Sequence, residues 1–206
     1  MTDPPYRIDT ERLVLRCWDP AEAPKLAAAV EASLDHLRPW MPWAHAYPQP
    51  IAETVALLRT FRGRFDLGKD FAYGIFSRDE SEVVGGTGLH RRDEGSLEIG
   101  YWIRTDQAGR GLGTEAAAAL TRVAFELCGI ERVDIRCEPD NVASRAIPRK
   151  LGYTEEATLR RRLHGPTGDP RRRDAVMYSM FAEELAGSPA SGAQLQAFDA
   201  LGTRLL

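Results

Sequence analysis

Apolar and polar residues follow one another along this chain in a pattern that predicts strands alternating with helices. Seven short segments carry the alternating or continuous apolar pattern of β-strands; they are residues 12–16, 71–76, 83–90, 97–103, 132–137, 154–162 and 175–181. Helical spacing, together with start and stop signals, predicts helices; they are residues 21–33, 51–67, 111–128 and 141–151. The pattern predicts the α/β class.

The connections between the predicted strands indicate a mixed sheet. Only a short turn separates residues 83–90 from residues 97–103, so these segments are expected to pair antiparallel. A helix separates residues 97–103 from residues 132–137, which predicts a parallel pair joined by a right-handed crossover. We expect a central mixed sheet of about seven strands with helices on both faces. Ligands of such sheets bind at the carboxyl ends of the parallel strands.

The last residues of the chain differ from the rest in composition. Residues 186–193 are rich in Gly, Ser, Ala and Pro, which predicts a linker. Residues 194–206 are expected to add a small helix. We therefore expect a single domain over residues 1–185, followed by a linker and C-terminal tail over residues 186–206.

A glycine-rich loop follows the strand predicted at residues 97–103 and opens the next helix. Gly109, Gly111 and Gly113 allow the backbone to approach an anion closely, and the first amides of a helix have no intrahelical partner. A P-loop requires Gly-x-x-x-x-Gly-Lys-Ser/Thr, and a dinucleotide loop requires Gly-x-Gly-x-x-Gly. The spacing of two between these glycines fits neither motif. The loop therefore predicts an anion site that belongs to neither of these two nucleotide-binding classes.

Composition narrows the range of partners. A net charge of −3 opposes binding to nucleic acid through charge alone. No apolar run has membrane-spanning length and no signal peptide is evident, so we expect a cytoplasmic protein with no membrane or direct nucleic-acid partner. The three cysteines form no Cys-x-x-Cys pair and the four histidines show no metal spacing, so no metal is expected. Monomer and homodimer both remain open.

Four segments, taken in order, resemble the GNAT acetyltransferases. They are residues 98–103, the glycine loop at 109–115, Asn141 followed by Ser144, and residues 150–153. Within that superfamily the chain looks most like the branch of ribosomal-protein N-terminal acetyltransferases (RimJ/RimL type), to which residues 10–16 and 37–43 are similar. The resemblance spans about residues 8–182.

The resemblance implies acetyl-CoA as cofactor and acetyl donor, and a sheet that splays between the fourth and fifth predicted strands. Amides of the glycine loop are expected to hold the pyrophosphate, and Asn141 to position the cofactor near its thioester. The pantetheine arm is expected to extend the fourth strand through its backbone amides. The expected cofactor residues are Ile99, Tyr101, Trp102, Ile103, Gln107, Gly109, Arg110, Gly111, Leu112, Gly113, Thr114, Asn141 and Ser144.

The chain departs from the family pattern at two positions. Ala108 stands where the family loop usually has Gln or Arg, and Gln107 lies one residue early. Cofactor binding is therefore expected to depend on backbone amides more than on side chains. Pro148 stands where many GNAT enzymes have a catalytic tyrosine, and it is expected to distort the helix beside Ser144.

Acetyl transfer to an amine requires a neutral nucleophile, and an α-amine with a pKa of about 8 is easier to deprotonate than a lysine at about 10.4. The resemblance implies Ser144 as general acid, with Glu98 or Glu156 as base. A shift of one residue exchanges Glu155 and Glu156 between the faces of the strand. Each residue also has a plainer interpretation: Glu98 and Glu156 as polar strand residues, Ser144 as an ordinary first-turn serine, and Asn141 as a helix cap.

The acceptor site is expected to involve Trp40, Trp43, Glu98 and Tyr101. Of the two tryptophans, we expect one to line the acceptor pocket and the other to lie in the core. The predicted function is transfer of acetyl to a primary amine, foremost the α-amine of a ribosomal or other protein N-terminus. Two alternatives stay open: a small-molecule amine, such as a polyamine or aminoglycoside, as acceptor, and a catalytically weak acyl-CoA-binding module.

Overall fold

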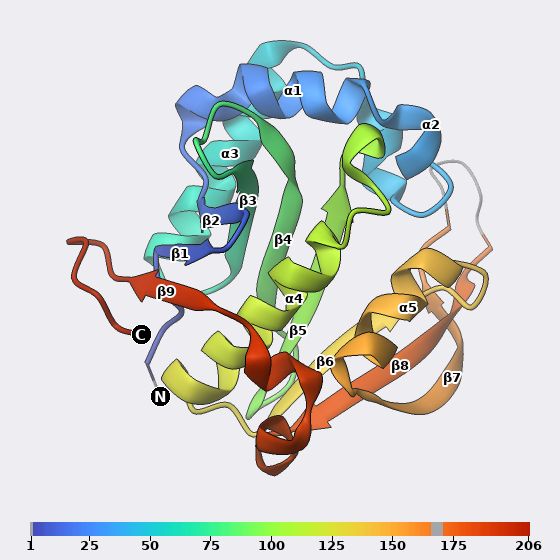
Figure 1. Cartoon of the computed structure of the whole chain (residues 1–206). Coiled ribbons are helices and arrows are strands. Elements are labelled where there is room, and N and C mark those ends of the chain that lie inside the picture. The colour runs from blue at the N-terminus through green and yellow to red at the C-terminus, as the bar shows by residue number, and fades with distance from the viewer. Residues whose placement is uncertain (1, 166–170) are drawn as a thin grey trace.

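Nine β-strands form a single mixed sheet in the computed structural model, whose described residues are 2–165 and 171–206 (Figure 1). The strands are β1 (Arg7–Thr10), β2 (Leu13–Cys17), β3 (Phe71–Ser77), β4 (Val83–Arg91), β5 (Ser96–Ile103), β6 (Arg132–Cys137), β7 (Thr154–Leu163), β8 (Arg173–Phe181) and β9 (Leu195–Phe198). Their order across the sheet is β7-β8-β6-β5-β4-β3-β2-β1-β9. Among the described strands β5 and β6 pair in parallel and the other neighbours pair antiparallel, which confirms the predicted mixed sheet.

All seven predicted strands are present, and two more lie at one edge of the sheet. The sequence pattern missed β1 because it is short and two of its four residues, Arg7 and Asp9, are charged. The small helix expected at residues 194–206 is wrong, because Leu195–Phe198 form β9 and run antiparallel along β1. The open edge of β1 supplies hydrogen-bond partners for an extended backbone, and the local sequence does not reveal this edge. Residues from the predicted tail therefore belong to the sheet.

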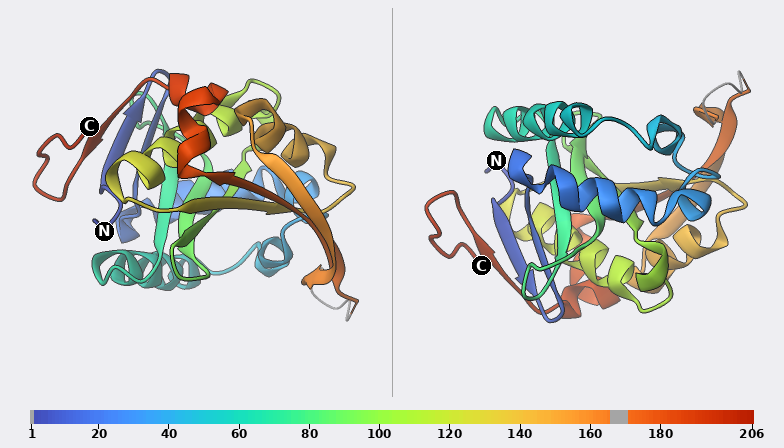
Figure 2. Two further views of the ribbon diagram at one scale, coloured as in Figure 1. Left: turned by 90° about the horizontal axis from the view of Figure 1, so that it is seen from below. Right: turned by 90° about the horizontal axis from the view of Figure 1, so that it is seen from above.

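Helices cover both faces of the sheet. The helices are α1 (Ala23–Glu31), α2 (Leu34–Leu37), α3 (Ile51–Asp66), α4 (Leu112–Arg122) and α5 (Val142–Leu151). Figure 2 shows the strands between α3 on one side and α4 on the other. Leu15, Ile75 and Ile99 face α4, whereas Val14 and Phe76 face the core that the sheet shares with α1 and α3. The side chains of successive strand residues thus pack into the cores on opposite faces of the sheet.

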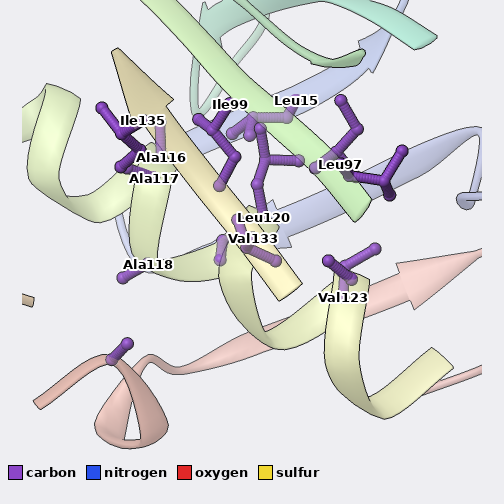
Figure 3. Packing of buried hydrophobic residues seen from close by; sticks show 14 of the residues in the cluster. Leu15, Leu97, Ile99, Ala116, Ala117, Ala118, Leu120, Val123, Val133 and Ile135 are labelled. Carbon is purple, nitrogen blue, oxygen red and sulfur yellow. The ribbon is translucent and has the colours of Figure 1, made fainter. Parts of the chain in front are cut away.

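Small side chains bring α4 close to the sheet. Residues Ala116, Ala117, Ala118 and Ala119 are all buried in the core that contains Leu97, Ile99 and Val133 (Figure 3). Alanine has the best helix propensity and occupies the least volume of the helix-forming side chains. The helix axis can therefore lie near the strands, and α4 begins directly at the glycine loop. The helix continues as a π-helical turn over Val123–Leu127 and ends before Gly129, whose φ is +65°.

The neighbouring strands β5 and β6 separate after three paired positions. Their register runs from Ser96↔Arg132 to Glu98↔Asp134. Beyond Glu98, β5 continues to pair with β4 as far as Gly85↔Ile103, but no described strand pairs with its other edge. The other strand, β6, stays with β8. This gap is the splay predicted between the fourth and fifth strands.

The hairpin of β7 and β8 agrees with the predicted final pair of strands. Its predicted turn at residues 165–170 lies outside the described residues except for Gly165. Within residues 2–165 and 171–206, no helix is long and apolar enough to cross a membrane.

Replacing Ala117 by leucine tests the close packing of α4. Ala117 is completely buried, so the larger side chain should force α4 away from the sheet and lower the free energy of unfolding by about 1–3 kcal/mol. Urea denaturation followed by circular dichroism measures the change. The matched control is Ala52→Leu on the exposed face of α3, which should leave stability nearly unchanged. Equal effects of the two substitutions would contradict the packing argument.

Candidate functional site

The glycine loop between β5 and α4 has a backbone that only glycine adopts readily. Gly109 and Gly111 have φ values of +75° and +79°, and Gly111 is the N-cap of α4. No atom lies within 4 Å of the position that a Cβ on Gly109 would take, so the loop surface is open at this point. Gly113 is needed for packing instead, because a Cβ there would lie 3.0 Å from Ile147 Cδ1. The first amides of α4 therefore lie at an open loop, as the sequence predicts for an anion site.

Hydrogen bonds connect the side chains around the loop to one another and to the loop backbone. Glu115 accepts hydrogen bonds from the Thr10 hydroxyl at 2.7 Å and from Arg12 Nε at 2.6 Å. Arg12 also donates to the carbonyl oxygen of Arg110 at 2.9 Å. The Gln107 side chain accepts from Arg110, so these two predicted cofactor residues are paired with each other. Of the other loop residues, Leu112 has its side chain in the core and contributes only its backbone.

A cavity of about 940 Å³ adjoins the gap between β5 and β6 and reaches the side of the sheet covered by α1 and α3. It brings together residues predicted at the cofactor with residues predicted at the acceptor. Those that line it are Ile99, Tyr101, Trp102, Asn141 and Ser144, together with Trp40 and Trp43. Ile103 and the loop residues 107–114 are not among the described residues of its lining.

Ser144 is held at the gap by Asn141 and Tyr101. Asn141 Oδ1 accepts the backbone N–H of Ser144 at 3.0 Å, which confirms its role as the cap of α5. The Tyr101 hydroxyl donates to the Ser144 carbonyl oxygen at 3.0 Å and lies 3.3 Å from Ser144 Oγ. Burial raises the pKa of Tyr101, so the hydroxyl stays protonated and remains a donor.

Pro148 does not break α5. The expectation of a distorted helix beside Ser144 is wrong, because α5 runs without interruption from Val142 to Leu151. Proline has no N–H, so the Ser144 carbonyl lacks the donor that position 148 would otherwise supply. The Tyr101 hydroxyl occupies that role from across the gap. The helix thus stays regular because another element satisfies the freed carbonyl.

The structure places neither predicted base on the wall of the cavity. The Glu98 carboxylate forms ion pairs with two arginines. One is Arg136, and the other is Arg92, whose guanidinium nitrogen lies 3.5 Å from Glu98 Oε1. Glu98 points to the same side of β5 as Gly100, but the described lining of the cavity includes its partner Arg136 and not Glu98.

Glu156 lies on the exposed edge strand β7, at a bulge between Glu155 and Ala157. The bulge inserts a residue and so changes which side chain faces α5. Glu155 accepts hydrogen bonds from Tyr178 and Arg149, both at 2.7 Å, and these bonds lower the pKa of Glu155 to about 2. Neither glutamate is among the described residues that line the cavity.

A histidine that no sequence motif indicates lies on the cavity wall, paired with a carboxylate behind it. His90 lies near the end of β4, and its Nδ1 is 2.7 Å from Asp70 Oδ1. A Cβ on Gly88 would lie 2.7 Å from His90 Nε2, and one on Gly100 would lie 3.4 Å from the same atom. These glycines leave room for the imidazole beside β5. Asp70 precedes β3, and Phe71 pairs with Leu89, so the pairing of β3 with β4 would have brought the two residues together.

The charge on Asp70 is stabilised by this contact. Burial alone raises the pKa of Asp70, but the hydrogen bond and charge of His90 outweigh burial and lower the pKa below its ordinary value. Asp70 is therefore ionised near neutral pH. The arrangement leaves Nδ1 of His90 engaged and Nε2 directed toward Gly88 and Gly100.

Both tryptophans of the predicted acceptor loop line the cavity. The expectation that one of them lies in the core is wrong, because neither Trp40 nor Trp43 is buried. The Trp43 ring contacts the rings of Trp102 at 5.8 Å and Tyr47 at 6.4 Å between centroids. Both indoles form part of the cavity wall instead.

Comparison with known proteins gives one consistent result. Residues 12–154 match the acetyltransferase (GNAT) domain family. The alanine N-acetyltransferase of ribosomal protein uS5 from Escherichia coli (strain K12) is 29% identical over 159 residues, which cover 74% of this chain and 80% of the relative.

Two solved structures share the fold. Mycobacterium smegmatis RimJ in complex with a CoA-disulfide has a TM-score of 0.81 and 25% identity, and the match covers 92% of this chain and 95% of that one. A ribosomal-protein α-N-acetyltransferase, RimL, in complex with coenzyme A has a TM-score of 0.75 and 23% identity, covering 87% and 98%.

A double-mutant cycle tests the link between Tyr101 and Pro148. Tyr101→Phe should cost about 1–3 kcal/mol of unfolding free energy, because the Ser144 carbonyl loses its donor. In a Pro148→Ala background, the new N–H at position 148 can reach that carbonyl, so the same substitution should cost clearly less. Chemical denaturation of the four proteins measures the coupling. An equal cost in both backgrounds would contradict the compensation.

Proposed function

The chain belongs to the acetyltransferase (GNAT) domain family, and we propose that its acceptor is the α-amine at the N-terminus of a peptide or protein. It is an N-acetyltransferase that uses acetyl-CoA. The observation that carries the proposal is the cavity that joins the gap between β5 and β6 to the opposite side of the sheet. The relative from Escherichia coli is named for the alanine of a ribosomal protein, and this supports a protein acceptor.

The residues present fit acetyl-CoA. Gly109 is open on the side that a Cβ would occupy, so a pyrophosphate can approach the amides of residues 109–114. The unpaired edge of β5 from Ile99 to Ile103 offers backbone groups to the amides of pantetheine. When bound, the cofactor supplies an acetyl group activated as a thioester. Asn141 and Ser144 lie on the cavity wall beside this edge, where they can contact the thioester end.

An α-amine suits this site better than a lysine. Its pKa of about 8 leaves a sizeable neutral fraction near pH 7, whereas a lysine at about 10.4 is almost fully charged. The site needs only one modest base to complete the deprotonation.

His90 is the residue best placed to be that base. The described cavity wall includes five side chains that commonly carry charge: Glu53, His90, Arg136, Glu138 and His164. Both oxygens of Glu138 accept from Arg173 at 2.8 Å. Glu53 and His164 are exposed. His90 Nε2 lies beside Gly100, at the start of the unpaired edge of β5.

In this proposal the side chains divide the proton transfers between them. His90 Nε2 accepts the proton that the attacking amine loses, and Asp70 stabilises the imidazolium that forms. Ser144, whose Oγ lies 3.3 Å from the Tyr101 hydroxyl, would supply the proton that the thiol of CoA needs, and its own hydroxyl would regain a proton from solvent. Glu98 and Arg136 form an ion pair beside the cavity and do not transfer protons.

Acceptor preference is the direct test of the proposed function. Thiol release from acetyl-CoA should be fastest with peptides that carry a free N-terminus, and slower with N-terminally blocked lysine peptides, polyamines and aminoglycosides. Mass spectrometry of the product should locate the acetyl group on the α-amine. Turnover of polyamines or aminoglycosides alone would contradict the peptide acceptor. Tight CoA binding without turnover of any amine would identify a binding module instead.

Substitution of His90 tests the proposed base. His90→Gln should lower kcat about 100-fold or more, with CoA affinity unchanged by calorimetry. Three charged groups surround His90 and Asp70. Glu98 on β5 lies opposite His90, and the charges of Arg92 and of Arg64 on α3 help to lower the pKa of Asp70.

Two further variants separate catalysis from packing. Asp70→Asn removes the anion that holds the imidazole and stabilises the charge it gains, so kcat should fall, but less than in His90→Gln. His36→Gln, at an exposed histidine of α2 outside the cavity, is the matched control and should behave as wild type. A kcat that is unchanged in His90→Gln and falls about 100-fold in Glu98→Gln would assign the base to Glu98.

A further inference from the structure

The chain has four tryptophans, and all four line the same cavity. Trp18 follows β2, Trp40 and Trp43 belong to the segment between α2 and α3, and Trp102 lies on β5. The same wall continues with apolar side chains from the two helices that cover this face; they are Leu26 and Val30 of α1, and Leu57 and Phe61 of α3. An amine alone needs no such surface. The wall indicates that the group attached to the amine is large and apolar.

Trp43 is the part of this wall that a ligand can bury. The residue is 41% exposed, although its ring meets Trp102 edge-on at 5.8 Å. Apolar area that loses water on binding contributes favourably in proportion to its size. The exposed part of the Trp43 ring therefore loses its contact with water when an apolar group of a ligand lies beside it.

The apolar wall starts close to the reacting end of the cavity. Trp102 is two residues from Gly100 on the same side of β5, and Gly100 faces His90 Nε2. A side chain on the carbon next to the amine can thus reach Trp102 and Trp43 while the amine lies at His90. This distance suits the first residue of a peptide.

A buried hydroxyl in the wall lacks a partner within the chain. Tyr47 is 4% exposed and lines the cavity, and its hydroxyl makes no hydrogen bond with any described residue. An unsatisfied buried hydroxyl is unfavourable, so such a group is expected to meet a polar group of a ligand. The backbone of an acceptor peptide carries donors and acceptors at every residue.

We infer that the cavity selects acceptors whose amine is followed at once by a large apolar or aromatic side chain, with Trp43 and Trp102 as its contacts and Tyr47 bonding the adjoining backbone. The inference rests on the proposed function and adds the identity of the first residue. Phenylalanine, tryptophan, leucine and methionine are the preferred first residues, and alanine, serine and aspartate are disfavoured.

Tetrapeptides that differ only in the first residue test the inference. The value of kcat/KM should be about 10- to 100-fold higher for a Phe-first or Leu-first peptide than for the Ala-first peptide. Trp43→Ala should lower the Phe/Ala ratio several-fold. Leu67→Ala, at a 68% exposed residue outside the cavity, is the control and should keep the ratio. Tryptophan emission during titration with phenylalaninamide or alaninamide gives a binding readout, because every indole of the chain adjoins the site.

The outcomes separate the two proposals. Efficient turnover of the Ala-first peptide with a Phe/Ala ratio near 1 would overturn the inference and leave the peptide acceptor intact. Turnover of tryptamine with no turnover of any peptide would support apolar recognition and overturn the peptide acceptor. A Phe/Ala ratio that is unchanged in both Trp43→Ala and Trp43→Leu would remove Trp43 from the selection.

Discussion

The organisation of the site depends on β5 and β6 parting after three paired residues. From Ile99 onward β5 has one edge bonded to β4 and one edge that pairs with none of the strands the structure describes. An unpaired edge inside a sheet must find other hydrogen-bond partners, and an amide-containing cofactor arm is such a partner. The gap also lets Tyr101 reach Ser144 on α5, and the cavity that adjoins it reaches the face of the sheet covered by α1 and α3.

Two compensations keep this opening stable. The Ser144 carbonyl, deprived of a donor by Pro148, receives the hydroxyl of Tyr101, so the departure from the family pattern at position 148 is matched by a contact across the gap. The buried alanines of α4 pack in the core that contains Leu97 and Ile99 of β5 and Val133 of β6. The chain is therefore well packed around an opening that stays free for a ligand.

Local sequence signals were enough for most of the architecture. Alternating apolar residues identified seven strands, and the glycine loop was recognisable because Gly109 and Gly111 need positive φ values. The edge strands β1 and β9 could not be recognised from the sequence, because each is four residues long and the two pair with each other. The capping role of Asn141 followed from its position, whereas the fate of the Ser144 carbonyl depended on a residue 43 positions away.

The candidate base shows most clearly what local sequence cannot predict about the site. Resemblance directed attention to Glu98 and Glu156, but ion pairs with Arg136 and Arg92 and a bulge in β7 are tertiary features that no local pattern reports. His90 and Asp70 are 20 residues apart and meet only because β3 pairs with β4. Sequence identified the chemistry of the reaction, and the strand register determined which side chains face it.

Hydrogen–deuterium exchange with and without CoA tests the central claim, that the cofactor occupies the gap along β5. The account predicts that saturating CoA slows exchange at the amides of residues 99–103 and 109–114, with little change in β2 and β3 on the far side of the sheet. Saturated binding without added protection at residues 99–103 would contradict it.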